Sequence, residues 1–96
     1  MKMHKPIHPG EFIKEVYLNE LKISEREVAL KLKVSPSTLN RLIKGQSSLS
    51  PEMALRLSIT LGRTPESWLA MQDNYSLYEA SKALNLDDVE KLGISA

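Results

Sequence analysis

The chain has 96 residues, a length that fits one domain, with 42% hydrophobic residues, 26% charged residues and a net charge of +1. It contains no cysteine, so disulfides and thiolate metal sites are excluded. Its longest apolar run, Trp68 to Met71, is far shorter than the roughly 20 residues that cross a bilayer, and no apolar stretch of a secretory signal follows the first lysines. We therefore expect a soluble, cytoplasmic protein that has no membrane partner.

Charge is distributed unevenly between the two halves of the chain. Residues 1–50 hold nine Lys and Arg against five Glu, which gives +4, whereas residues 51–96 hold four Lys and Arg against seven Asp and Glu, which gives −3. A basic half beside an acidic half suggests that the first binds a polyanion and the second a different partner. Asymmetry of this size also arises by chance, so charge alone leaves both interpretations open.

Residues 1–8 are expected to form a flexible leader. His4 and His8 have the i, i+4 spacing that binds metal on a helix, but Pro6 between them and Pro9 after them disfavour a helix. No further ligand type lies nearby, so we predict no metal site. A first helix is expected over residues 9–21, with one apolar stripe formed by Phe12, Ile13, Val16 and Tyr17.

Hydroxyl residues that directly precede proline mark three further helix starts. The hydroxyl caps free N–H groups of the first turn, and proline at the first helical position loses no needed donor. Another start lies at Ser24, with Glu27 in the capping-box position, while Gly45 and Gly62 lie where helices are expected to end. The three pairs are Ser35-Pro36, Ser50-Pro51 and Thr64-Pro65. The predicted fold is all-α, its five helices being 9–21, 24–32, 36–44, 51–61 and 65–84.

The last of these helices is apolar on two sides. At about 100° per residue, Trp68 and Tyr75 share one side, whereas Leu77 and Leu84 lie on the opposite side. A second partner usually covers such a helix at the end of a small domain, and a second copy of the chain is the expected one. Alternatively, the tail 86–94 covers these leucines, and Trp68 belongs either to the core or to an interface. The expected dimerisation residues are Tyr75, Leu77, Tyr78 and Leu84.

The helices 24–32 and 36–44, joined by a short turn, predict a helix-turn-helix over residues 24–45. Ala29 is the small residue that lets the two helices approach each other, and Val34 fills the corner between them. We expect a DNA-binding domain over residues 9–72 and a helical dimerisation extension over residues 73–96.

The helix 36–44 has an apolar face and a polar face. Leu39, Leu42 and Ile43 form the apolar face, and the polar face contains no acid, although a merely solvated face would more often mix Glu with Lys. Its side chains are of types that hydrogen-bond base edges and phosphates, so the expected ligand is double-stranded DNA. The N-terminal part of such a helix reaches deepest into the major groove. The expected base contacts are Ser37, Thr38, Asn40 and Arg41.

Phosphate contacts are expected at the borders of this face. Lys44 lies in the last turn, Gln46 and Ser47 follow in the loop, and Ser35 stands at the helix start, where free N–H groups bind phosphate. Such contacts hold the protein in register, whereas base contacts specify the sequence.

Several segments carry a resemblance to a known family. They are His8-Pro9-Gly10-Glu11, Val34 to Leu39 followed by Arg41 to Gly45, Ser50 to Leu57, Leu61-Gly62, and Trp68-Leu69 with Gln72. With these, residues 7–78 resemble the XRE/Cro-type helix-turn-helix family, and more narrowly the HigA-type antitoxins of toxin–antitoxin modules. The resemblance implies a homodimer that represses its own operon and that neutralises a HigB/RelE-like mRNA interferase toxin. If the last helix dimerises the chain, the operator is expected to be palindromic. The resemblance implies no cofactor.

Two positions depart from the family pattern. Near the start of its second helix the family often has Gln, which contacts a phosphate, but Glu25 and Arg26 stand here. Glu25 cannot donate to a phosphate, so either Arg26 takes over or the contact is absent. The turn usually contains Gly, whereas Lys33 stands here, and a positive φ at such a residue would cost roughly 1 kcal/mol.

Three other classes of function compete with this prediction. An enzyme is not expected, because neither a Gly-rich phosphate loop nor a Ser–His–Asp set is present. A protein-interaction module fits the acidic C-terminal half, but it would not need an acid-free polar face on the helix 36–44. Single-strand RNA readers need aromatic platforms, which that helix lacks. A repressor that has no toxin remains an alternative within the family.

Overall fold

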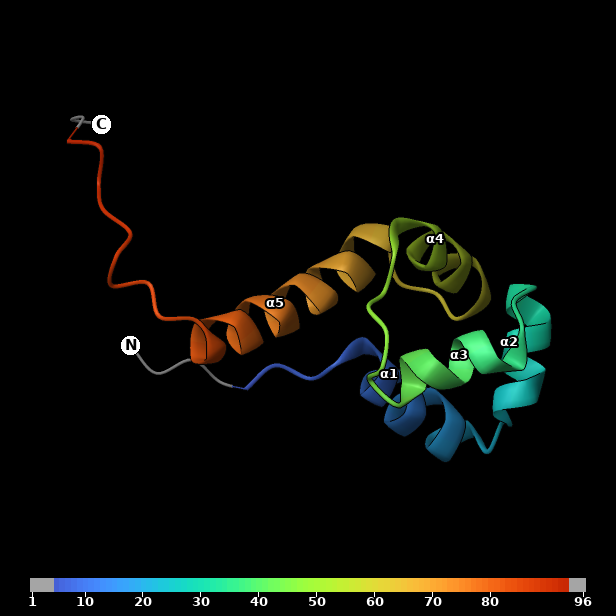
Figure 1. Ribbon diagram of the computed structural model, residues 1–96. Coiled ribbons are helices and arrows are strands. Elements are labelled where there is room, and N and C mark those ends of the chain that lie inside the picture. The colour runs from blue at the N-terminus through green and yellow to red at the C-terminus, as the bar shows by residue number, and fades with distance from the viewer. Residues whose placement is uncertain (1–4, 94–96) are drawn as a thin grey trace.

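The computed structural model describes residues 5–93, so His4 and the other residues of the segments 1–4 and 94–96 lie outside the described residues. Its elements are α1 (Pro9–Phe12), η1 (Ile13–Asn19), α2 (Glu25–Leu32), α3 (Pro36–Ile43), α4 (Pro51–Thr60) and α5 (Pro65–Ala83). Figure 1 shows α1 and η1 continuing as one helix and α5 projecting away from the other helices. Within residues 5–93 there is no strand, so the prediction of an all-α, five-helix fold is confirmed.

The predicted helix starts are also confirmed. Each of the four capping side chains accepts a hydrogen bond from the backbone N–H three residues further on, as a cap does. Gly45 and Gly62, with φ of 73° and 95°, follow the ends of α3 and α4 within two residues. The four caps are Ser24, Ser35, Ser50 and Thr64.

The first helix differs from its prediction in winding. Its middle, Ile13–Asn19, is a π-helix, in which hydrogen bonds run from i to i+5 and each turn is wider than an α-turn. As a result Leu18, five residues after Ile13, is buried, whereas Val16 is 41% exposed. The predicted inward position of Val16 is therefore wrong, because that stripe assumed α-helical spacing.

The prediction of a flexible leader is wrong for its last residue. The His8 side chain is only 6% exposed, and its Nδ1 accepts a hydrogen bond of 2.9 Å from the Gly10 N–H, which caps α1. The His8 ring also meets the Tyr75 ring of α5 edge-on, with 4.8 Å between the ring centroids. His8 thereby joins the start of the first helix to the last helix.

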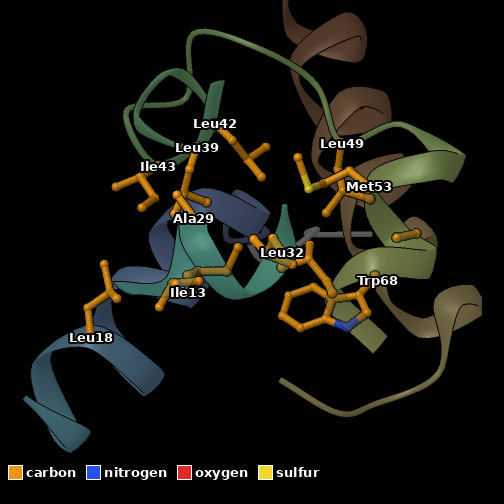
Figure 2. Packing of buried hydrophobic residues seen from close by; sticks show 13 residues of the cluster. Ile13, Leu18, Ala29, Leu32, Leu39, Leu42, Ile43, Leu49, Met53 and Trp68 are labelled. Carbon is orange, nitrogen blue, oxygen red and sulfur yellow. The ribbon is translucent and has the colours of Figure 1, made fainter. Parts of the chain in front are cut away.

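A single apolar core lies between the helices. Figure 2 shows its side chains directed inward from η1, α2, α3, α4 and α5. Trp68 is fully buried in it, and its indole N–H donates a hydrogen bond of 2.9 Å to the Gly62 carbonyl. The core interpretation of Trp68 is thus confirmed.

The C-terminal extension is helical only as far as Ala83. From Leu84 onward the described tail is exposed and leads away from the helices (Figure 1), which corrects the prediction of a helical segment over 73–96. Leu77 and Leu84 are 66% and 59% exposed, so the tail does not cover them. None of the helices within residues 5–93 is both long and apolar enough to cross a membrane.

At Gly10 the backbones of α1 and α3 approach each other closely. A Cβ atom added there would overlap the Leu42 carbonyl oxygen, and backbone cannot move aside as a side chain can. We predict that Gly10→Ala lowers the free energy of unfolding by about 1–3 kcal/mol or more, as overpacking does. Ala70→Ser, which also adds one heavy atom but on an exposed site of α5, should change it by less than about 0.5 kcal/mol in the same urea titration.

His8 should make stability depend on pH. Burial lowers the pKa of His8 from its ordinary value of 6.5, against the opposing effects of a hydrogen bond with the Ser47 backbone and of the Glu11 charge. Below about pH 6.5 the unfolded chain therefore binds the proton more readily than the folded chain. The free energy of unfolding consequently decreases as the pH is lowered. We predict that wild type loses more stability between pH 7.5 and 5.5 than His8→Asn, which keeps a capping side chain without titrating. Equal losses in the two proteins, measured by urea unfolding, would contradict this prediction.

Candidate nucleic-acid interface

The helices α2 and α3 are joined by a tight turn over residues 33–35. Ala29 is 1% exposed, and its carbonyl accepts a hydrogen bond of 3.1 Å from the Val34 N–H. Lys33 has φ 62° and ψ 41°, the left-handed conformation that its place in the turn predicts. Both small-residue packing and turn geometry are thus those of a helix-turn-helix.

Arg56 of α4 completes the end of α2, which sequence reasoning did not foresee. Its guanidinium donates a hydrogen bond of 2.8 Å to the Leu32 carbonyl and pairs with Glu52 at 3.3 Å. A cation is favourable at the C-terminal end of a helix, where carbonyl groups are left without partners. No local sequence pattern predicts this role of Arg56, because 24 residues separate it from Leu32.

The two faces of α3 are confirmed as predicted. Leu39, Leu42 and Ile43 are buried in the core. The four expected base-contact residues all lie outside the core: Ser37 and Arg41 are exposed, and Thr38 and Asn40 are half-buried.

Hydroxyl groups at the start of α3 form a connected cluster. Ser35 Oγ accepts from the Thr38 N–H at 3.1 Å and lies 2.7 Å from Thr38 Oγ1 and 3.2 Å from Ser37 Oγ. The capping residue therefore also orients the first two expected base contacts. Held hydroxyls lose less side-chain entropy when they bind a ligand.

Asn40 is tied to α2. Its Nδ2 donates a hydrogen bond of 2.9 Å to Glu25 Oε1, so one of its two N–H donors is already used. The same bond fixes the Glu25 carboxylate beside the polar face of α3. From the sequence alone, Glu25 is only a residue that cannot donate to phosphate. Its hydrogen bond with Asn40 forms only when α2 packs against α3.

The loop after α3 lies against two of the expected base-contact residues. A cleft of about 180 Å³ is lined by Thr38 and Arg41 of α3 together with Ser47 and Ser48. The Gln46 N–H donates to the Arg41 carbonyl at 2.8 Å, and the Leu49 N–H donates to Oε1 of the buried Gln72 at 2.8 Å. The loop is thus fixed both to α3 and to α5.

The expected phosphate-contact residues lie on α2, at the two ends of α3 and in the loop after it. Four of them are exposed and Ser47 is half-buried, so all are accessible to a ligand at the surface. In the described part of the chain neither Arg26 nor Lys44 forms an ion pair with a carboxylate. The exposed four are Arg26, Ser35, Lys44 and Gln46.

These features place the chain in the class of helix-turn-helix proteins. A helix-turn-helix family model matches residues 13–69, and the chain belongs to this family. It is 41% identical over 92 residues to the uncharacterized HTH-type transcriptional regulator YddM of Escherichia coli strain K12, covering 96% of this chain and 97% of that protein.

Solved structures of antitoxins have the same fold. The antitoxin GraA superimposes with a TM-score of 0.87 at 35% identity, covering 94% of this chain and all of that one. The Pseudomonas aeruginosa antitoxin HigA, solved with the higBA promoter, gives a TM-score of 0.85 at 33% identity, covering 93% and 99% of the two chains. The resemblance to HigA-type antitoxins is confirmed.

Lys33 carries backbone strain that glycine would remove. We predict that Lys33→Gly raises the free energy of unfolding by about 1 kcal/mol, because glycine adopts the left-handed conformation without a steric cost. Lys31→Gly, two residues earlier inside α2, should instead lower it by about 0.5–1 kcal/mol. If the two variants shift the urea midpoint in the same direction, the strain assigned to Lys33 is wrong.

Proposed function

We propose that this chain is a DNA-binding antitoxin that represses its own operon as a homodimer and neutralises a HigB/RelE-like mRNA interferase toxin in the cytoplasm. The observation that carries the DNA-binding part is the acid-free outer face of α3, held in place by α1, α2 and the following loop. The antitoxin part is supported by similarity over nearly the whole chain to proteins named antitoxins GraA and HigA, the latter solved with promoter DNA. The chain acts by binding, as its family does, rather than by catalysis.

The recognition helix α3 enters the major groove with its N-terminal half leading. Arg41 is the residue best suited to guanine, because its guanidinium can form two parallel hydrogen bonds to one base. Thr38 and Ser37 present hydroxyls that Ser35 orients, and Asn40 retains a carbonyl oxygen and one N–H for a base.

Phosphate contacts flank these base contacts on both sides. The exposed side chains on α2, at the start of α3 and in the following loop hold the duplex backbone and fix the register of α3 in the groove. Among these residues are Arg26, Ser35, Lys44, Gln46 and Ser47.

Dimerisation through α5 gives the operator its symmetry. Leu77, on the part of α5 that projects from the core, and Leu84, directly after the end of α5, remain exposed. A second copy can cover them together with Tyr78. Tyr75 already packs edge-on against His8, so it borders this interface rather than forming its centre. A two-fold dimer places two copies of α3 about one helical turn of DNA apart, or a multiple of it, and thus requires a palindromic site.

A repressor without a toxin is the second candidate, and the similarity to a protein named a transcriptional regulator favours it. The two are separated by expressing the small reading frame adjacent to this gene, with and without this chain. Growth arrest that this chain relieves supports the antitoxin. A harmless neighbour, together with specific binding of DNA upstream of the gene, leaves the repressor.

Arg41→Ala should weaken binding to the operator by about 1–3 kcal/mol and relax the preference at one base pair. The reason is that truncation leaves one base edge without its two hydrogen bonds. Titrations against a set of operators with single base-pair changes measure this effect. An equal loss on every sequence would show that Arg41 contacts phosphate instead.

Lys44→Ala is the matched comparison for Arg41→Ala, because each variant removes one positive charge. It should weaken binding to all sequences alike and make the dependence of log K on log salt shallower by about one. An unchanged salt slope would remove Lys44 from the DNA interface.

Leu77→Asp should shift the protein from dimer to monomer, because a charge would be buried in the α5 interface. Leu92→Asp, on the exposed tail, introduces the same charge outside the interface and should leave the dimer intact. Light scattering at micromolar concentration distinguishes the two states. A monomeric wild type would overturn the proposed dimer and its palindromic operator.

A further inference from the structure

A basic pocket lies beside the end of the recognition helix. Its volume is about 370 Å³, and it is formed by the segment before α1, the first helix, the end of α3 and α5. Three lysines from three of these parts of the chain line it: Lys5, Lys14 and Lys44. Only Lys44 was expected at the DNA interface, since Lys5 and Lys14 lie outside the helix-turn-helix in sequence.

The charges of this pocket are not balanced. Glu11 is the one carboxylate among its lining residues, so the lining carries a net charge of +2 with His8 neutral. In the part of the chain that the structure describes, the ion pairs are Arg56–Glu52 and Lys82–Glu79, and both lie elsewhere. Cations gathered without partners repel one another, and an anion bound among them relieves this repulsion.

Buried contacts hold the walls of the pocket together. His8 caps α1, its ring meets Tyr75 of α5 edge-on, and Gly45 lines the pocket beside it. These contacts fix the extended segment 5–8 beside the loop that leaves α3. Lys5, three residues before His8, is thus carried to the same pocket as Lys44.

We infer that this pocket binds the phosphate backbone of the DNA duplex that α3 reads, so that the DNA interface extends to Lys5 and Lys14. The inference rests on the proposed DNA binding. Lys44 and Gly45 belong both to the pocket and to the end of the recognition helix, so the pocket is continuous with the proposed interface. Contacts to phosphate from outside the helix-turn-helix add affinity but carry no sequence information.

The test is the double variant Lys5→Gln/Lys14→Gln in salt titrations of operator and unrelated DNA. Binding should weaken by similar factors on both DNAs, and the slope of log K against log salt should become shallower by about two, one for each lysine. Lys31→Gln/Lys91→Gln has the same change in net charge on exposed residues outside the pocket and should keep the wild-type slope. Lys5→Arg/Lys14→Arg, which preserves both charges, should keep it as well.

The outcomes separate this inference from the proposed function. If wild type binds the operator specifically, but both Gln variants give the same slope, the pocket does not bind DNA phosphate and the inference is overturned. A wild type that prefers no DNA sequence overturns the proposed function, and with it this inference. Both lysines are exposed, and circular dichroism of each variant confirms that the comparison is made between folded proteins.

Discussion

The recognition helix is positioned by a contact between backbones. At Gly10 the first helix comes so close to the Leu42 carbonyl of α3 that no side-chain atom fits between them. Two main chains in contact leave little freedom for sliding or tilting, because neither can adopt another rotamer. The C-terminal end of α3 is therefore fixed by α1, while the tight turn at Lys33 fixes its N-terminal end against α2.

Polar side chains from other elements then complete this arrangement. Arg56 supports the end of α2, Gln72 holds the loop after α3, and Glu25 accepts a hydrogen bond from Asn40. In the described part of the chain, every buried side-chain nitrogen or oxygen has a hydrogen-bond partner. A satisfied network of this kind specifies one arrangement of the helices, because any other would leave a buried donor or acceptor unpaired.

The helix α5 serves two different environments along its length. Near its start Trp68 and Gln72 are buried in the core, whereas its later part projects from the core (Figure 1) and carries the exposed Leu77, with the exposed Leu84 directly after the helix end. A projecting helix with exposed apolar side chains gains stability by burying them against another chain. The whole of α5 lies in the acidic half of the sequence, whereas the proposed DNA contacts all lie in the basic half, residues 1–50.

Much of the fold was predictable because its signals are local. A capping hydroxyl acts on an N–H only three residues away, so Ser35 and Thr64 revealed helix starts directly. The two faces of α3 followed from helical periodicity in the same way, and with them the location of the candidate site. The π-helical winding of the first helix was not predictable from that periodicity, because its apolar residues Phe12, Ile13, Val16 and Tyr17 also fit the spacing of an ordinary α-helix.

The sequence by itself thus determined the helices, the helix-turn-helix and the residues that face outward from α3. Only the tertiary structure decided which distant residues meet there. Three features depend on packing between segments far apart in the chain: the burial of His8, the hydrogen bond between Asn40 and Glu25, and the placement of Lys5 and Lys44 in one pocket. Such pairs leave no periodic trace in the sequence, because their contact depends on how whole helices pack rather than on spacing along the chain.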